Sequence, residues 1–166
     1  MDTIGHIWVC RTGISGQFEK LFLDKSLICL TRENLDINLS KSEKDVVIEK
    51  IRNGDSLLAK QTISNIWSQI NIFANKMGIG DLVIIPRKAS RLISIAVIIG
   101  EYTFEPTKAF PLNHSRTIRV LKSEVDTVSF PQEIKYSLGA FRTIFGVRQV
   151  DELIDLLEKE GYLNEV

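Results

Sequence analysis

Two apolar runs, residues 82–86 and 92–100, are separated only by the basic segment 87–91. Short runs of branched aliphatic residues bounded by turn signals are typical of strands, so these two runs predict a hairpin with a basic loop. Similar runs predict further strands at 6–11, 27–30, 115–121, 125–130 and 142–147. Several short strands with helices inserted early favour the α+β class and a small mixed β-barrel over a doubly wound α/β sheet.

The helices of this fold are expected to flank the barrel. The clearest one spans residues 63–77, where apolar residues recur at three- and four-residue steps and Gly78 supplies a stop. A shorter helix is expected over 17–25, and another after Ser42, which has the chemistry of an N-cap. The last helix is expected from Val150 onward, with an acidic face opposite its apolar one.

The chain has 166 residues, of which 44% are hydrophobic, and this is enough for one domain with a full core. Its formal net charge is zero, which argues against a uniformly basic nucleic-acid binder. The charges are unevenly placed, however. Residues 87–122 contain seven basic and two acidic side chains, whereas residues 149–166 contain six acidic and one basic. The middle segment is therefore a candidate phosphate-facing surface, with an ordinary solvated face as the alternative.

The two cysteines, Cys10 and Cys29, each lie inside an apolar run, without a Cys-x-x-Cys pair or zinc-ligand spacing. They predict buried thiols in a reducing compartment. Because His6 and His114 are the only histidines, we expect no metal site and no cofactor. The N-terminus lacks the pattern of a secretory signal, and the longest apolar stretch is too short for a membrane span. We therefore expect a cytoplasmic protein with no membrane partner.

Basic residues are concentrated at two places in the predicted sheet. Arg87, Lys88 and Arg91 lie in the hairpin loop, and Arg116 and Arg119 alternate with apolar residues on a later strand. Both sets are candidates for contacts with phosphate groups.

Ser15 lies in the turn 12–16 after the first strand, where backbone N–H groups could cradle a phosphate. The turn lacks the Gly-Lys-Ser/Thr of a phosphate loop and is one residue short of a nucleophile elbow, so a plain turn is the alternative. Since no catalytic signature is clear, we expect a binding module and not an enzyme.

A metal-dependent nuclease is a further alternative. Asp126, Glu133 and Lys135 have the acid, acid-x-Lys layout in which carboxylates hold a magnesium ion and the lysine steers a water. Pro131 lies where such an enzyme needs a regular strand, which favours a chance match.

Trp67 lies on the apolar stripe of helix 63–77, so core packing is its simplest interpretation. The alternative is base recognition. A base taken out of its stack needs a flat aromatic partner and groups that bond its edge, while Arg and Lys hold the flanking phosphates.

Five blocks of the chain resemble, in order, a PUA-like domain of the EVE and YTH kind that forms the N-terminal part of Mrr-type restriction endonucleases. The blocks are residues 7–13, 66–73, 77–88, 95–102 and 136–141. The resemblance extends over residues 6–148, and it implies a small twisted β-barrel with flanking helices whose relatives read modified bases. By matching position it implies a base pocket formed by Arg11, Thr12, Asn65, Trp67 and Tyr102.

The resemblance predicts a reader domain at residues 1–148, followed by an acidic helix or linker at 149–166. Its function would be to recognise a modified base in double-stranded DNA, such as methylated or hydroxymethylated cytosine, by base flipping within a restriction system. The family's nuclease domain has no counterpart in this chain, so cleavage would require a nuclease in cis or in trans. A single-stranded RNA-binding module of the same barrel type is the alternative.

Overall fold

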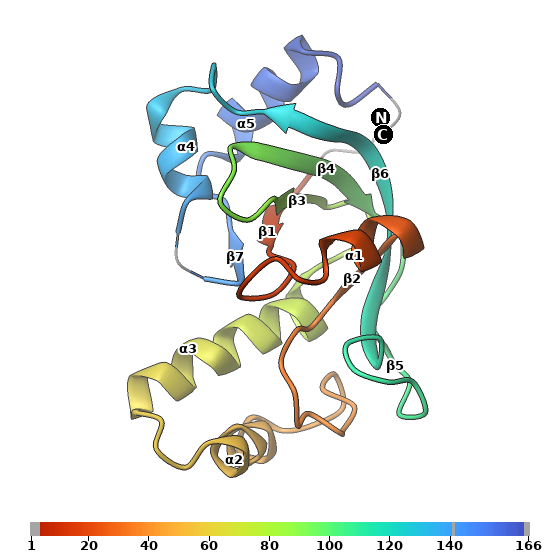
Figure 1. The fold of residues 1–166 in the computed structure, drawn as a ribbon, viewed down its shortest axis with the longest axis vertical. Helices are drawn as coiled ribbons and strands as arrows, with labels where there is room; N and C mark the ends of the chain where they lie inside the picture. Colours follow the sequence, from red (N-terminus) through yellow and green to blue (C-terminus); the bar gives the residue numbers. More distant parts are fainter. Residues whose placement is uncertain (1–3, 141, 165–166) are drawn as a thin grey trace.

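The computed structural model describes residues 4–140 and 142–164 (Figure 1). The strands are β1 (Ile7–Cys10), β2 (Leu27–Cys29), β3 (Leu82–Pro86), β4 (Leu92–Ile98), β5 (Thr103–Phe104), β6 (His114–Asp126) and β7 (Ile144–Gly146). Within the described residues these seven strands form one strongly curled sheet, a half-barrel, in the order β2-β6-β4-β3-β1-β7 with β5 beside β6. The predicted α+β class and curled mixed sheet are therefore confirmed. Phe141, which ends the predicted block 136–141, lies outside the described residues, as do the outer ends of the two predicted domains.

The sheet is mixed because β1 runs parallel to β3, while β1 and β7, β3 and β4, and β4 and β6 are antiparallel. The prediction of two strands at 115–121 and 125–130 was wrong, since β6 is one long strand that ends at Asp126. Its polar residues 122–124 resemble a turn in the sequence. In the structure they continue the ladder through register shifts opposite β4, with Glu124 at a φ of 56°.

The helices lie on both sides of the sheet (Figure 1). They are α1 (Glu19–Lys25), α2 (Lys44–Gly54), α3 (Lys60–Asn71), α4 (Gln132–Leu138) and α5 (Val150–Lys159), and α3 continues into a π-helical turn at Ile72–Lys76. Ser42 was wrongly predicted as the cap of α2: the N-cap residue is Glu43, and the Ser42 hydroxyl donates to the carbonyl of Asn38 at 2.6 Å. Helix α4 was not predicted at all.

Alternate residues of the buried strands face two separate cores. In β1, Trp8 and Cys10 contribute to the core beneath α1, α2 and α3, whereas Ile7 and Val9 contribute to the core beneath α4 and α5. The two-residue period of a strand sends neighbouring side chains to opposite faces, so a strand covered on both faces is apolar throughout. This explains why β1, β3 and β4 are almost entirely apolar, with Ser94 the one polar residue among them.

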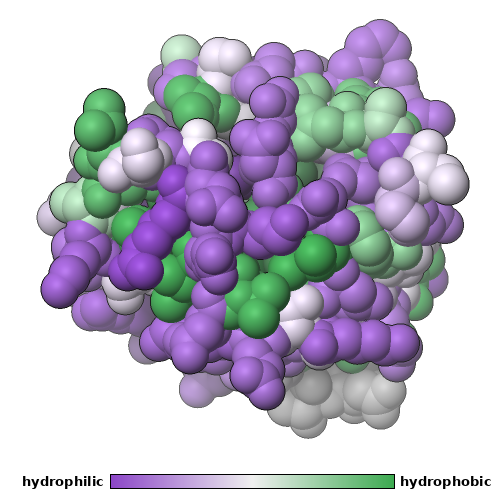
Figure 2. All heavy atoms as spheres, turned by 90° about the horizontal axis from the view of Figure 1, so that it is seen from below, coloured by the Kyte–Doolittle hydropathy of each residue, from purple (hydrophilic) through white to green (hydrophobic). Residues whose placement is uncertain are grey.

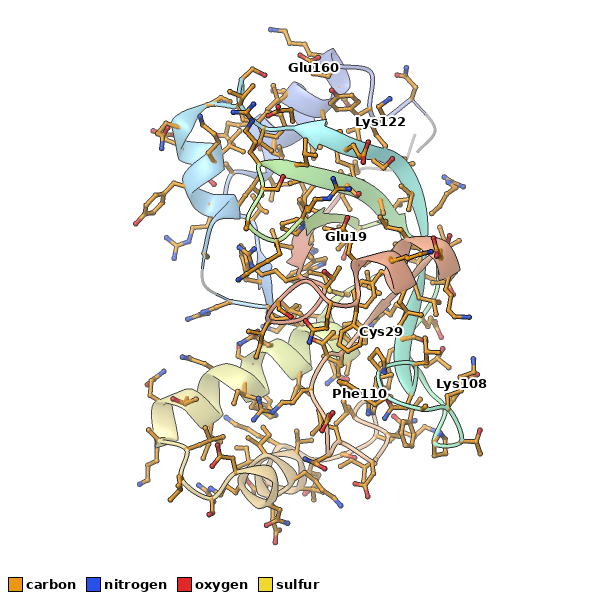
Figure 3. The ribbon with its side chains drawn as sticks, viewed as in Figure 1. Glu19, Cys29, Lys108, Phe110, Lys122 and Glu160 are labelled. Atoms are coloured by element: carbon orange, nitrogen blue, oxygen red, sulfur yellow. The ribbon has the colours of Figure 1, made fainter. Side chains whose placement is uncertain are left out.

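The C-terminal helix α5 is part of this packing. Leu153 and Leu157 are fully buried in the second core, while the acidic side chains lie on the outer face of the helix. Glu160, just after α5, lies at the end of the molecule away from α2 and α3 (Figure 3). The segment that begins at residue 149 therefore contributes to the folded unit through this helix.

Seen from the α2 and α3 end, the surface is largely hydrophilic with hydrophobic side chains between (Figure 2). Val46 on α2 and Leu57 between α2 and α3 are exposed. Among the described residues, no helix combines the length and the apolar character that crossing a membrane would require. Cys10 and Cys29 are buried free thiols, as predicted, and burial raises the pKa of both.

Candidate functional site

A cleft of about 550 Å³ lies where three segments meet: the turn after β1, the β3–β4 hairpin loop, and the segment between α4 and β7. In the described part of the chain its lining contains six basic side chains and no acidic one. The basic residues are Arg11, Arg87, Lys88, Arg91, Lys135 and Arg142. A concave surface lined by charges of one sign concentrates its field on a ligand of the other sign. The cleft is therefore the first candidate for a ligand site, and it favours an anion.

Arg11 follows β1 and fixes one wall of the cleft. Its Nε donates to the carbonyl of Arg142 at 3.1 Å, and its Nη2 donates to the carbonyls of Leu138 and Ala140 at 3.2 and 2.9 Å. The last carbonyls of a helix have no partner inside the helix, so a guanidinium can satisfy them. Burial lowers the pKa of Arg11 from its usual value. Arg11 thus adds positive charge to the cleft while its donors hold the end of α4.

Thr12 is 1% exposed and lines the cleft, and its Oγ1 is buried without a hydrogen-bond partner among the described residues. A buried polar group without a partner costs about 1–3 kcal/mol, so such groups are uncommon in native proteins. Because Oγ1 itself exposes almost no surface, a ligand in the cleft can bond this hydroxyl once the atoms that cover it move aside.

The turn 12–16 lies directly against the hairpin loop because it contains Gly16. A Cβ at Gly16 would lie 2.7 Å from the Cβ of Lys88, and its φ of 71° belongs to the left-handed region that favours glycine. Ser15, predicted as a phosphate contact, uses both its backbone N–H and its hydroxyl on Oε1 of Gln17, at 3.0 and 2.8 Å. Ser15 is therefore beside the cleft and engaged within its own turn.

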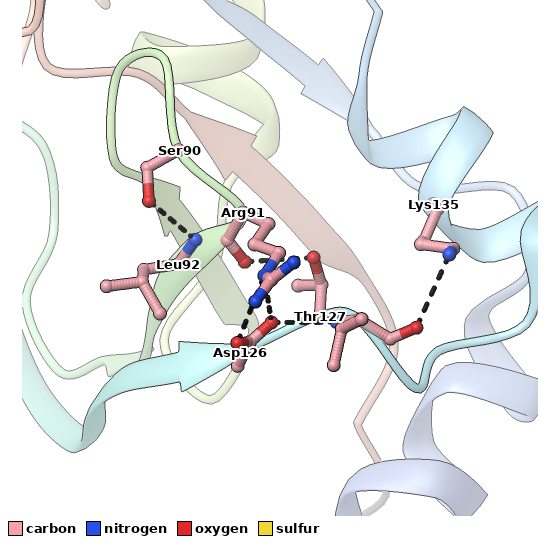
Figure 4. Close-up of polar contacts among 7 residues, drawn as sticks. Ser90, Arg91, Leu92, Asp126, Thr127 and Lys135 are labelled. Atoms are coloured by element: carbon pink, nitrogen blue, oxygen red, sulfur yellow. Dashed lines mark hydrogen bonds and ion pairs between the residues drawn. The ribbon is translucent and has the colours of Figure 1, made fainter.

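Two of the cleft's cations are already paired with carboxylates. Glu19 on α1 lies beside the hairpin (Figure 3), and its Oε1 is 3.1 Å from Nε of Arg87, whose Nη2 is 3.1 Å from Oε1 of Glu124. These carboxylates raise the pKa of Arg87. Arg91 pairs with Asp126 at 3.0 Å (Figure 4). Both arginines therefore present less net charge to a ligand than their formal values.

Hydrogen bonds to backbone carbonyls also hold the segment after β6, on one side to the hairpin loop and on the other to α4. Thr127 donates from its Oγ1 and its N–H to the carbonyl of Arg91, at 2.9 and 3.0 Å, and Lys135 donates to the carbonyl of Val128 at 3.4 Å (Figure 4). Among the described residues, the side chains of Lys88 and Arg142 have neither a carboxylate partner nor a hydrogen-bond acceptor. These two cations, one on each of two walls, are the ones free to meet an anion.

The structure does not bring the predicted α3 residues into the cleft. Trp67 is half-buried against the first core, and Nζ of Lys44 lies 4.3 Å from its ring centroid. Oδ1 of Asn65 accepts a hydrogen bond from Gln61 at 3.1 Å. Core packing is therefore what Trp67 does in this structure.

Tyr102 also lies elsewhere, in a buried hydrogen-bond chain. Nε2 of His114 contacts the carbonyl of Leu35, which can only accept, so Nε2 carries the proton and Nδ1 accepts from the Tyr102 hydroxyl at 2.7 Å. The Tyr102 oxygen in turn accepts from the N–H of Leu39 at 3.1 Å. Burial lowers the pKa of His114. The chain holds the loop 35–39 against β6.

Arg116 and Arg119, predicted to contact phosphates, are on β6 and not in the cleft. Arg116 is 4% exposed, and its guanidinium donates to the carbonyls of Phe73, Ala74 and Gly100 at 2.7, 3.4 and 3.4 Å. The carbonyls of Phe73 and Ala74 belong to the π-helical turn at the end of α3, where helical partners run out, and Arg116 satisfies them together with the carbonyl of Gly100 after β4. Arg119 is exposed opposite Val97.

The residues of the nuclease alternative do not have the geometry it requires. Glu133 and Lys135 are on helix α4 and not on a strand, and Asp126 is paired with Arg91. Among the described residues, no group of three metal-ligating side chains is close enough to hold an ion.

Sequence reasoning missed Lys135 and Arg142 as cleft residues because it missed α4. The signal was present: Pro131 precedes Gln132 and Glu133, and Ile134 and Leu138 are four residues apart. A proline followed by an acidic first turn and an i, i+4 apolar pair is typical of a short helix. The predicted residues that the structure does assemble in the cleft are Arg11, Thr12, Arg87, Lys88 and Arg91.

The fold and the cleft together define an α+β domain with a curled mixed sheet and a basic cleft at the hairpin end. The chain belongs to a family described as a domain of unknown function, DUF8426, whose model matches residues 15–140. The match includes the hairpin loop and α4, while β1, β7 and α5 lie outside it. No curated protein matches the chain.

Proposed function

We propose that this domain binds DNA and holds one modified base, turned out of the duplex, in the basic cleft. The modification proposed is a methyl or hydroxymethyl group on cytosine. The observation that carries the proposal is the cleft's lining, which in the described part has six basic side chains, no acidic one, and the unpartnered hydroxyl of Thr12.

The phosphates next to the turned-out nucleotide would be held mainly by Lys88 and Arg142. Arg87 and Arg91 face carboxylates already, so a phosphate gains less from them. Phosphate contacts of this kind supply affinity that depends strongly on salt, whereas the base contacts supply selectivity.

The base would enter a space of suitable size and chemistry. The cleft's 550 Å³ lies in the range of small-ligand pockets, about 300–1,000 Å³. Ile93 and Leu138 give it an apolar wall that suits a methyl group, and Thr12 can bond a base edge. Since no aromatic side chain is among its described lining, a base would rest on apolar side chains and guanidinium planes.

The resemblance of residues 6–148 to PUA-like readers of modified bases supports the same proposal. It also supports a role as the specificity part of a restriction system, in which a nuclease in cis or in trans cuts the DNA. The protein itself would be a reader and not an enzyme.

The proposal is tested by fluorescence anisotropy with labelled duplexes that differ only at one cytosine, which is unmodified, methylated or hydroxymethylated. Affinity should fall as salt rises from about 50 to 200 mM, and a modified duplex should bind more tightly than the unmodified one. A single-stranded RNA of the same sequence is the competitor. Preference for the RNA, or equal affinity for all three duplexes, would overturn the proposal.

A matched pair of double variants separates the cleft from general charge. Lys88→Gln with Arg142→Gln removes two cleft cations, and Lys41→Gln with Arg52→Gln removes two exposed cations elsewhere. The cleft variant should lower the slope of log affinity against log salt by about 1.8, since each phosphate contact contributes about 0.9. The control should keep the wild-type slope. Equal slopes for both variants would place the binding outside the cleft.

A further inference from the structure

A second groove of about 670 Å³ adjoins the basic cleft. Its lining comes from α4, from β7 and from the residues that flank β7, and Arg142 lines both hollows. The two hollows are therefore neighbours, with one cation between them. The groove's floor includes the buried side chain of Phe145.

Tyr136 forms one side of this groove and is 81% exposed. The helical geometry explains this exposure. Ile134 and Leu138 anchor α4 in the second core, and Tyr136, two positions from each, points to the opposite side of the helix. Among the described residues the Tyr136 side chain has no hydrogen-bond or ring partner. A large ring face with one edge in solvent is what a nucleobase needs for stacking.

The groove also carries positive charge. Arg142 and Arg148 line it and are exposed, and neither side chain has an ion-pair partner in the described part of the chain. Glu133 is the acidic residue of the lining, so the groove has a net positive charge. An exposed aromatic ring beside arginines fits a nucleotide, whose base stacks and whose phosphate is anionic.

We propose that Tyr136 and Arg148 form a second subsite for the nucleotide that follows or precedes the turned-out one on the same strand. Its base stacks on Tyr136, and Arg142 holds the phosphate between the two nucleotides while Arg148 holds the next. The inference rests on the proposed function, because Arg142 can join the two subsites only if the cleft holds a nucleotide.

The test measures the affinities of Tyr136→Ala and wild type for two duplexes. Both duplexes carry the same modified cytosine, and in one of them the two neighbouring nucleotides on that strand are abasic. Tyr136→Ala should weaken binding of the intact duplex by about 5-fold or more, as expected for one stacked base, and leave the abasic duplex unchanged. Tyr136→Phe should bind as wild type, because it keeps the ring.

Leu57→Ala is the matched control, since Leu57 is 93% exposed and lies near α2, away from the groove. It should bind both duplexes as wild type does. An equal loss on both duplexes, or no loss with Tyr136→Ala, would overturn the second subsite while the proposed function stands. If wild type binds none of the duplexes, the proposed function fails and the subsite fails with it. An unchanged melting temperature of Tyr136→Ala shows that its effect is not unfolding.

Discussion

Thr12→Val is predicted to stabilise the free protein and to weaken its complex. The substitution replaces a hydroxyl with a methyl group of similar volume at a site that is 1% exposed. Because Oγ1 has no partner among the described residues, the folded protein carries the desolvation cost of about 1–3 kcal/mol. Removing the hydroxyl should therefore raise the free energy of unfolding by about 1 kcal/mol.

In the complex, the same hydroxyl would bond the ligand. Its loss should reduce affinity by about 0.5–1.5 kcal/mol if it bonds a neutral base edge, and by about 1.5–3 kcal/mol if it bonds a phosphate oxygen. These values correspond to about 2- to 13-fold and about 13- to 160-fold. The size of the loss thus reports which part of the nucleotide meets Thr12.

Urea denaturation gives the free energy of unfolding, and anisotropy titration gives the affinity. Thr127→Val is the matched control, because Thr127 is 8% exposed and its Oγ1 donates to the carbonyl of Arg91 at 2.9 Å. The control should lose about 1 kcal/mol of stability. If Thr12→Val loses as much as the control, its hydroxyl has a partner in the folded protein and the reasoning is refuted.

Three other predictions concern stability. Arg116→Met should lower the free energy of unfolding in urea by about 3 kcal/mol, because it leaves the carbonyl of Phe73 and two others buried without donors; a loss below about 1 kcal/mol would contradict this. Since burial lowers the pKa of His114, the unfolded chain binds its proton first, so stability should be constant above about pH 6.5 and fall as the pH decreases below it. Melting temperatures across this range should show the fall in wild type and a smaller one in His114→Gln. Leu157→Ala, in the fully buried face of α5, should cost about 2–5 kcal/mol by urea denaturation, whereas a near-zero cost would mean that α5 is a detached tail.

Much of the sheet could be predicted because the residues of each central strand are enough by themselves to indicate a strand. Residues 82–86 and 92–98 are apolar apart from Ser94, a polar loop separates them, and both form strands. The continuity of β6 through residues 122–124 could not be predicted. Lys122 and Glu124 look like turn residues, and only the pairing with β4 keeps them in the ladder. Tertiary pairing decided this part of the fold.

The candidate site was predictable only in part, for a related reason. Arg87, Lys88 and Arg91 are basic in a hairpin loop, and their place at a cleft follows from the sheet. Trp67 and Arg116 have the chemistry of ligand contacts, but the first packs against Lys44 and the core, and the second satisfies carbonyls of a π-helical turn. No local sequence pattern predicts a π-helical turn. The role of Arg116 as a donor to that turn therefore could not be predicted from the residues around Arg116.

The placement of β1 between β3 and β7 has a consequence for the order in which the protein assembles. Residues 7–10 are synthesised before both of their partners, residues 82–84 on one side and 144–146 on the other. Pairings so distant in the chain form slowly. Until residue 146 has been made, one edge of β1 remains open, and open apolar edges promote pairing between chains. Of the strands of this sheet, β1 is thus made first and enclosed last, and the newly made protein depends on residues 144–146 to protect residues 7–10.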